Sequence, residues 1–398
     1  MRNMVTNLSI TFVLLITALF SPTPALAEGI KVGVILPLTG KLAPIGKIER
    51  DSFLMAMEEI NAAGGIRGRT IDLILEDTAS RPEMGRLAIK KLVSKDKAIV
   101  VGGGCSSPVT YEVAALAQEE KIPFVINTAS ADKITEEGWK YVFRLNPPAS
   151  EYTRTLALFL KEVARVKTAA VLFEDGPFGR FGLKRFLRMC KRSDLKVLIK
   201  RGYEPEMPEF KSFLMGVANK KPDLVYLASH AAETSMIMHQ AMELDFNPGL
   251  FVWHPPGLTI PESFEYAGSA SEYIFTLALW SPYLPYPGAK EYYKKFFERF
   301  NSSPDYHGAE AYSAMYVIAD ALKRTRSLAP GDVRDALAGT NMMTVFGPVK
   351  FTSYGKKTQQ NLLPTLVLQR LRGRFEVVWP RGLAAMEYIY PVPKWKER

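Results

Sequence analysis

The stretch from Ala98 to Ser130, AIVVGGGCSSPVTYEVAALAQEEKIPFVINTAS, decides the expected fold. Its opening residues are apolar and rich in β-branched side chains, which is typical of a buried strand. Gly102 to Gly104 then allow the backbone to bend, and Ser107 followed by Pro108 is a signal for the start of a helix. A second apolar strand is expected at 122–126. The stretch therefore predicts a strand, a helix and a second strand that lies parallel to the first.

Both turns of this unit carry a hydroxyl side chain. Ser107 lies where the first helix begins, and Ser130 lies where the next helix is expected to begin. The carboxyl ends of neighbouring parallel strands meet at the same edge of a sheet. Free backbone N–H groups at two helix N-termini would therefore lie beside two hydroxyl groups. This arrangement suits a small carboxylate or another anion.

Strands and helices alternate on both sides of Asn146-Pro147-Pro148, where the pattern breaks and starts again. This predicts an α/β protein with two doubly wound parallel-sheet lobes that are joined by a hinge of several crossovers. A hairpin is expected near the end of the chain, around Leu371-Arg372-Gly373. The ligand site of such a protein lies between the lobes, at the carboxyl ends of the strands. The expected boundaries are 28–146 and 283–345 for lobe 1, and 147–282 and 346–398 for lobe 2.

Residues 1–27 have the features of a secretory signal. Arg2 is followed by the apolar core Ile10–Phe20, which is short for a membrane span, and Ala25-Leu26-Ala27 has the small-x-small form of a cleavage site. We therefore expect a signal peptide that is cleaved after Ala27 and a mature protein that is periplasmic. An uncleaved membrane anchor is the alternative.

The composition argues against several classes of protein. The chain has 398 residues, and its net charge of +10 comes from scattered basic residues without a nucleic-acid-binding motif. The turn at Gly102 is not a phosphate loop, because no GK[ST] follows it, and the chain has no GxSxG or HExxH motif. Cys105 and Cys190 lack the spacing of a metal site and are expected to be free thiols. The sequence predicts no enzyme activity, no metal, no cofactor and no nucleic-acid partner, and we expect a monomer.

Several motifs occur in the order in which a known family has them. They are Pro37-Leu38-Thr39-Gly40, the run EEINAAGGI at 58–66, Ile122-Pro123 and Gly347-Pro348. In these motifs the chain resembles the type I periplasmic binding proteins, most closely the branch that binds leucine, isoleucine and valine for ABC transporters. The resemblance implies the two-lobed fold, capture of a small ligand and delivery to an ABC transporter membrane permease. A sensor that docks on a membrane receptor or kinase is the alternative.

The resemblance also implies which residues contact the ligand. In the family, a serine after the third strand and a hydroxyl after the fourth strand hold the ligand carboxylate. An apolar residue of the first lobe packs on the ligand, and the second lobe adds an aromatic residue and the end of a strand. In this sequence the matching residues are Ser106 with Ser107, Ser130 with Thr128, Ile45, Phe178, and Ser229 or His230.

One departure from the family concerns the α-ammonium group of an amino acid. Amino-acid binders of the family have an acid after the strand that here starts at Leu250, but residues 251–257 read FVWHPPG, without a carboxylate. A buried ammonium without a paired acid is costly. The expected ligand is therefore an aromatic or aliphatic carboxylate, or an amide or urea-type molecule, whose body contacts Trp253 and His254. If an amino acid binds, the acid would be Glu174, Asp175 or Glu233.

Overall fold

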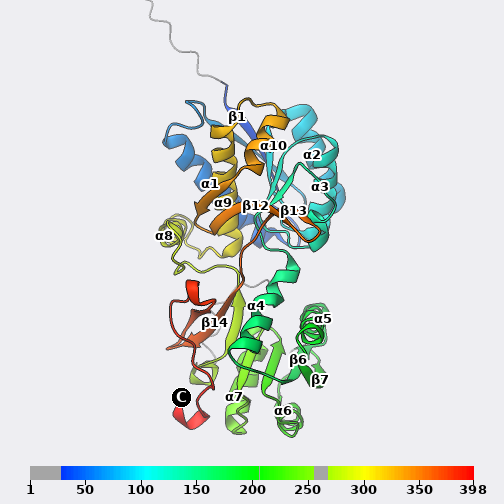
Figure 1. Cartoon of the computed structure of the whole chain (residues 1–398), viewed down its shortest axis with the longest axis vertical. Helices are drawn as coiled ribbons and strands as arrows, with labels where there is room; N and C mark the ends of the chain where they lie inside the picture. Colours follow the sequence, from blue (N-terminus) through cyan, green and yellow to red (C-terminus); the bar gives the residue numbers. More distant parts are fainter. Residues whose placement is uncertain (1–27, 206, 255–267) are drawn as a thin grey trace, which may run out of the picture.

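The computed structural model describes residues 28–205, 207–254 and 268–398, which form two lobes that lie end to end (Figure 1). Each lobe has one central sheet with helices on both faces. The expected signal peptide at 1–27 lies outside the described residues. In the part of the chain that is described, no helix is long and apolar enough to cross a membrane.

Lobe 1 is built around an eight-stranded sheet. Its strands are β1 (Ile30–Leu36), β2 (Ile71–Asp77), β3 (Val100–Gly103), β4 (Phe124–Ile126), β5 (Val142–Arg144), β11 (Asn341–Thr344), β12 (Gly347–Tyr354) and β13 (Lys357–Asn361). Its helices are α1 (Ala43–Ala62), α2 (Pro82–Lys91) with a π-helical turn (Leu92–Asp96), α3 (Ser107–Glu119), a 3₁₀ turn (Asp132–Thr135), α8 (Ala289–Phe300), α9 (Tyr306–Arg324) and α10 (Pro330–Ala338). The strand order is β11-β12-β13-β5-β4-β3-β1-β2, with β1 to β5 and β13 parallel and the pairs of β12 antiparallel.

Lobe 2 has a seven-stranded sheet of the same kind. Its strands are β6 (Thr168–Glu174), β7 (Lys196–Tyr203), β8 (Leu224–Ala228), β9 (Leu250–Trp253), β10 (Phe275–Ala278), β14 (Leu366–Leu371) and β15 (Arg374–Trp379). Its helices are α4 (Ala149–Glu162), α5 (Pro177–Arg192), α6 (Lys211–Ala218), α7 (Ala231–Glu243) and the 3₁₀ turns Arg381–Leu383 and Trp395–Glu397. The strand order is β15-β14-β10-β9-β8-β6-β7, parallel from β10 to β7 and antiparallel through the predicted hairpin β14–β15.

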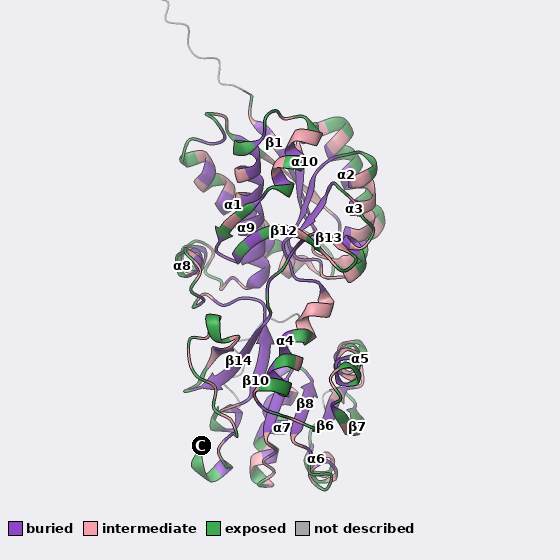
Figure 2. Cartoon of the chain, viewed as in Figure 1, coloured by how far each residue is buried: buried purple, intermediate pink, exposed green. Residues whose placement is uncertain are grey.

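The central strands are buried because helices cover both faces of each sheet (Figure 2). All residues of β3 are buried. On one face of the lobe 1 sheet Phe53 of α1 and Ile318 of α9 belong to the core, and on the other face Ile89 of α2 and Val113 of α3 do. Strands covered on both faces read as continuous apolar runs, which explains why the sequence pattern predicted them.

Within the described residues the chain passes three times between the sheets, after β5, after β10 and after β13. Trp280 in the second connection donates from Nε1 to the Val345 carbonyl oxygen of lobe 1 at 2.8 Å. Gln360, just before the third connection, donates from Nε2 to the carbonyl oxygen of Asn146 in the first connection at 2.9 Å. The hinge of several crossovers is confirmed, and its connections are tied to lobe 1 and to each other.

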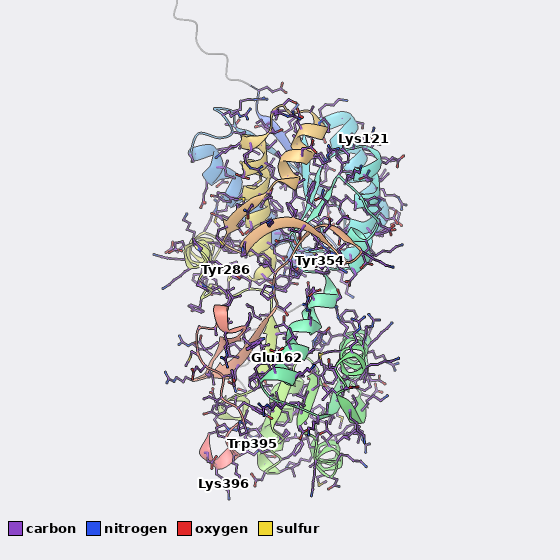
Figure 3. All side chains as sticks on the ribbon, viewed as in Figure 1. Lys121, Glu162, Tyr286, Tyr354, Trp395 and Lys396 are labelled. Atoms are coloured by element: carbon purple, nitrogen blue, oxygen red, sulfur yellow. The ribbon has the colours of Figure 1, made fainter. Side chains whose placement is uncertain are left out.

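The expected return of the chain to lobe 2 at residue 346 is wrong. β12 and β13 belong to the lobe 1 sheet, where Gln360 of β13 pairs with Arg144 of β5. The ring of Phe351 on β12 lies 5.1 Å from that of Phe143, between centroids. Figure 3 shows Tyr354, at the end of β12, on lobe 1 and Trp395 at the far end of lobe 2. The chain therefore returns to lobe 2 only after β13, since the two strands lie between β11 and β5 in the first sheet.

Arg144, the last residue of β5, is a fully buried cation with 0% of its surface exposed. Its Nε donates to Gln360 Oε1 at 2.7 Å, and its Nη2 donates to Thr135 Oγ1 at 2.9 Å. Nη1 donates to the carbonyl oxygens of Ala131 at 2.7 Å and Ala129 at 3.2 Å. Burial lowers the pKa of Arg144 to about 10, so the group is charged at neutral pH. The guanidinium holds the turn after β4 against β13 through uncharged acceptors.

We expect Arg144→Met to lower the free energy of unfolding by about 3 kcal/mol, because Gln360, Thr135 and two carbonyl groups lose a buried donor. Urea denaturation measures this loss. The matched control is Arg154→Met: the Arg154 side chain is 63% exposed and pairs with Glu151 on the same helix. The control should lose less than about 0.5 kcal/mol. Equal losses in the two variants would contradict the role of Arg144.

Candidate functional site

A cavity of ≈ 250 Å³ lies between the two lobes. Its size is near the lower end of the range for small-molecule sites. Among the predicted site residues, the structure brings Ile45, Ser107, Thr128, Ser130 and His254 together around it. The described lining comes from lobe 1 (Leu42, Ile45, Cys105, Ser107, Thr128, Ser130, Tyr306 and His307) and lobe 2 (Tyr152, Phe181, Arg185 and His254).

Ser107 is the first residue of α3, and the turn before it requires glycine. Gly103 has a φ of +109°, and a Cβ at this position would lie 2.3 Å from the Ile35 carbonyl oxygen. The N-cap is Ser106 rather than Ser107, and its side chain makes no capping hydrogen bond. The Ser107 hydroxyl accepts a hydrogen bond from the backbone N–H of Ala131 at 3.2 Å. Its own proton is then available to donate into the cavity.

Thr128 and Ser130 reach the same cavity from the turn after β4. The Thr128 hydroxyl donates to Glu49 Oε1 at 2.6 Å and accepts from Asn127 Nδ2 at 2.8 Å. A hydroxyl group has one proton, so Thr128 has none left for a ligand in this arrangement. The Ser130 carbonyl oxygen accepts from the backbone N–H of Ala149 at 2.7 Å. This bond fixes the Ser130 backbone, and the Ser130 hydroxyl, which also interacts with the Tyr152 side chain, is the second candidate donor.

The placement of Ser106 and of the second helix start differs from the prediction. Ser106 does not line the cavity; with Cys105 and Thr110 it lines a small hollow inside lobe 1. After Ser130 the chain forms one 3₁₀ turn, Asp132–Thr135, instead of a full helix. Besides α3, two helices of lobe 1 begin at the cavity: α1, with Leu42 and Ile45 in the lining, and α9, with Tyr306 and His307.

Arg185 is the charged group in the lobe 2 wall. It lies four residues after Phe181 on α5, on the same side of the helix, and both side chains line the cavity. The guanidinium carbon lies 5.4 Å from the ring centroid of Tyr152 and 5.0 Å from that of Phe181, and Nη2 donates to the Ala149 carbonyl oxygen. Burial lowers the pKa of Arg185, yet a guanidinium remains protonated at neutral pH. Two rings and a carbonyl group therefore hold a full positive charge at the cavity.

His254 lines the cavity from the end of β9. Burial and, to a smaller extent, the charge of Arg185 lower the pKa of His254 to about 4, so its ring is neutral at neutral pH. Its Nδ1 has no hydrogen-bond partner among the described residues. Phe178 stacks against His254 at 5.8 Å and against His230 at 4.7 Å, between ring centroids. Phe178 and His230 thus support His254 without lining the cavity themselves.

Two of the predicted site residues, Trp253 and Ser229, do not line the cavity. Trp253 is 0% exposed, and its Nε1 donates to the Ser229 carbonyl oxygen at 2.9 Å. The Ser229 hydroxyl is buried and hydrogen-bonded to that of Thr234 at 2.7 Å. Successive side chains of a strand point to opposite faces of the sheet. Trp253 therefore enters the apolar core under α6 and α7, and only its neighbour His254 reaches the cavity.

Several lining residues were missed by sequence reasoning. Phe181 and Arg185 had a usable signal, because they lie three and seven residues after Phe178 and share its side of a helix. His307 also had a sequence signal, because Asp305 two residues earlier is a typical N-cap residue and marks the start of a helix. In the structure Asp305 is the N-cap, and its Oδ1 accepts from the His307 backbone N–H at 3.0 Å. Tyr152 had none: it reaches the cavity only because α4 starts directly after the first crossover.

Two buried carboxyl groups lie behind the lobe 1 wall. Glu49 of α1 and Glu310 of α9 are both 0% exposed. Burial raises the pKa of Glu49 to about 7, and burial together with repulsion from Glu49 raises the pKa of Glu310. Burial alone would lower the pKa of His307, but Asp305, whose Oδ2 lies 2.9 Å from His307 Nδ1, raises it above its ordinary value. In all three groups the surroundings favour the protonated form relative to the free side chain.

The described lining of the cavity contains no carboxylate. Glu174 is buried, and its Oε2 accepts a backbone hydrogen bond at 3.3 Å. Asp175 pairs with Arg180 at 2.8 Å, and Glu233 lies on α7 away from the lining. The three acids considered as partners for an ammonium therefore do not reach the cavity, and its electrostatics favours an anion.

The two cysteines are free thiols, as expected. Cys105 lines the cavity, and burial and the nearby Glu49 raise the pKa of its thiol. In residues 28–205, 207–254 and 268–398 no group of three or more His, Cys, Asp or Glu side chains is arranged to hold a metal ion.

Comparison with known proteins gives a family and several relatives. The model of a family described as periplasmic binding protein matches residues 29–368. A leucine-, isoleucine-, valine-, threonine-, and alanine-binding protein of Pseudomonas aeruginosa is 26% identical over 349 residues, which are 88% of this chain and 92% of that protein. A Leu/Ile/Val-binding protein homolog 7 of Brucella melitensis is 24% identical, over 94% of this chain and 98% of its own.

Solved structures share the two-lobed α/β fold. The branched-chain amino acid transporter substrate binding protein LivJ of Streptococcus pneumoniae, in complex with isoleucine, has a TM-score of 0.69 and 22% identity, covering 88% of this chain and 100% of its own. A solute binding protein of R. palustris in complex with benzoate has a TM-score of 0.68 and 21% identity, covering 90% of this chain and 98% of its own. The fold expected from the sequence is thereby confirmed.

We expect stability to depend on pH through Glu49. Its pKa of about 7 in the folded protein lies above the ordinary value of 4.5, so the folded chain keeps a proton that the unfolded chain loses. The resulting stabilisation is complete below pH 4.5 and disappears as the pH rises through about 7. Relative to the parent, Glu49→Gln should therefore gain up to roughly 3 kcal/mol in free energy of unfolding between about pH 5 and pH 8. Urea denaturation at a series of pH values measures the difference.

Glu58→Gln is the matched control on the same helix. Glu58 is exposed, and its hydrogen bond and ion pair with Arg299 lower its pKa. It is ionised in both folded and unfolded chains above about pH 5, so its variant should keep a constant difference from the parent. If Glu49→Gln also kept a constant difference, Glu49 would not be protonated in the folded protein.

Proposed function

Because the chain belongs to the periplasmic binding protein family, we propose that it is an exported solute-binding protein that captures a small carboxylate between its lobes and delivers it to the permease of an ABC transporter. One observation carries the proposal: the cavity has hydroxyl donors, a helix start and a guanidinium, and its described lining has no carboxylate. The relatives support a small ligand, since the P. aeruginosa protein is named for amino acids and the R. palustris complex contains benzoate. Leucine and benzoate both have a carboxylate.

Lobe 1 receives the carboxylate first. The N-terminal N–H groups of α3 have no partner inside the helix, and they favour an anion. Ser107 and Ser130 add hydroxyl donors at the same edge of the sheet. These groups belong to one lobe, so a ligand can dock there before the lobes close.

Arg185 then binds from lobe 2. A charge-assisted hydrogen bond from a guanidinium to a carboxylate is stronger than one between neutral groups. Because Arg185 and Ser107 belong to different lobes, a ligand that contacts both stabilises the closed arrangement over the open one. Closure is then a shift of population toward the state in which both sets of contacts exist.

The remaining lining suits the uncharged body of the ligand. Leu42, Ile45 and Phe181 offer apolar contacts, and the neutral ring of His254 offers a flat surface with an unpartnered nitrogen. An aromatic or branched aliphatic body suits these surroundings, because neither the body nor these lining residues leaves a buried charge without a partner.

An acid without an ammonium group fits the cavity better than an amino acid. A buried ammonium would have Arg185 nearby and no carboxylate in the described lining, and such an arrangement is unfavourable. An amide or urea-type ligand would leave Arg185 without an anionic partner. We therefore expect deaminated acids and benzoate-like acids to bind more tightly than amino acids or amide and urea-type ligands.

A thermal-shift screen of residues 28–398 tests the ligand class. The panel contains benzoate, the deaminated acid of leucine, leucine and benzamide. We expect the two acids to raise the midpoint, because a ligand that binds only the folded state stabilises it by mass action, whereas leucine and benzamide should leave it unchanged. A shift with leucine alone would overturn the proposed ligand class and leave the family assignment intact.

We expect Arg185→Gln to weaken binding of the best acid by roughly 10- to 100-fold, because a hydrogen bond to a charged group is lost. Isothermal titration calorimetry measures the dissociation constant. Arg185→Lys should retain part of the affinity, and Arg188→Gln, one helical turn away and exposed, should change it less than about twofold. The assignment of Arg185 fails if the Gln variants at 185 and 188 bind equally well.

A further inference from the structure

The positive charge of the chain is concentrated in one part of lobe 2. Residues 161–201 contain twelve basic and four acidic residues, a net charge of +8 compared with +10 for the whole chain. In the sequence these basic residues form no long run, which is why they were interpreted as scattered. Seven of them are exposed residues of the end of α4, the loop after it and α5.

Exposed cations line one side of α5. Lys184, Arg188 and Lys191 follow each other at spacings of four and three residues, so they lie on the same side of the helix. All three are exposed, as is Arg192 next to them. No acidic residue occurs within α5. In Figure 1 the helix lies at the outer edge of lobe 2.

A hollow of ≈ 210 Å³ lies between α4 and α5 beside these cations. Lys161, Arg165 and Lys167 line it from the end of α4 and the following loop, and Met189 and Ser193 line it from α5. Apart from these cations and the serine, its lining is apolar. A basic rim around an apolar interior suits a molecule that has an anionic head and an apolar body.

These seven cations form no salt bridge within the part of the chain that the structure describes. Some other exposed cations are paired: Arg180, at the start of α5, lies 2.8 Å from Asp175, and Lys91 of lobe 1 pairs with both Glu76 and Asp96. Seven such cations have only two exposed acids next to them in the sequence, Glu162 and Asp194, so they repel one another and produce a positive potential over the surface. That potential attracts an anionic partner.

We propose that this surface, the basic face, docks on a membrane surface that contains anionic phospholipids. Basic side chains along a surface helix attract a layer of lipid phosphates cumulatively, and the hollow has room for an apolar segment below a phosphate. The attraction acts over about 10 Å and is screened by salt. The basic face consists of Lys161, Arg165, Lys167, Lys184, Arg188, Lys191 and Arg192.

This docking goes beyond ligand capture and does not depend on the identity of the ligand. The same helix carries Phe181 and Arg185 at the cavity and the basic face on its outer side. An acidic protein surface is the competing partner, and the experiment separates the two.

Vesicle sedimentation tests the proposal. The protein of residues 28–398 is mixed at low salt with vesicles of phosphatidylcholine alone, or of equal parts phosphatidylcholine and phosphatidylglycerol. We expect binding to the anionic vesicles only, reversed at high salt. The variant Lys184→Glu/Arg188→Glu/Lys191→Glu should bind at least about tenfold more weakly.

The matched control reverses three exposed cations of lobe 1 that form no salt bridge with any residue the structure describes. Lys95→Glu/Lys121→Glu/Lys140→Glu gives the same change in net charge far from the basic face, as Figure 3 shows for Lys121. It should bind the anionic vesicles within about twofold of the parent. Equal losses in both variants would overturn the proposal, because the effect would then come from net charge alone. Binding to poly-glutamate without binding to anionic vesicles would also overturn it, in favour of an acidic protein partner.

Discussion

The buried guanidinium of Arg144 is the interaction on which the ligand cavity depends. It joins the end of β5, the turn after β4 and strand β13, which are far apart in the sequence. That turn carries Ser130 to the cavity, and β13 leads directly into the third crossover. All the acceptors are uncharged. The N–H groups of Arg144 therefore hold the backbone in place and do not neutralise an acid. One residue thereby couples the shape of the site to the hinge.

The charged groups around the cavity are divided between the two lobes. Lobe 1 has its acids behind the wall: Glu49 is buried and engaged by Thr128 and Asn127. Lobe 2 presents Arg185, held between two aromatic rings, and a neutral His254. An anion therefore meets hydroxyl and backbone donors on one side and a cation on the other. Binding energy that needs both sides is available only when the lobes are closed.

Local patterns explain which predictions succeeded. The βαβ unit after Ala98 was predictable because buried strands and glycine turns leave signals within a few residues. The hairpin β14–β15 was predictable for the same reason. The return at 346 was not, because no local pattern in β12 or β13 says which sheet they join, and only the pairing of β13 with β5 decides the lobe. Trp253 was misplaced by one position, which in a strand reverses the face of the sheet.

By itself, the sequence determined the alternating α/β architecture, the two lobes, the family and the hydroxyl-bearing turns at Ser107 and Ser130. These features depend on residues that are neighbours along the chain. The tertiary structure alone decided that Tyr152 and Arg185 of lobe 2 meet those hydroxyls, and that the acids considered for an ammonium stay away from the cavity. A cavity between lobes is closed by crossovers that join distant segments, and no local pattern records which side chains such crossovers bring together.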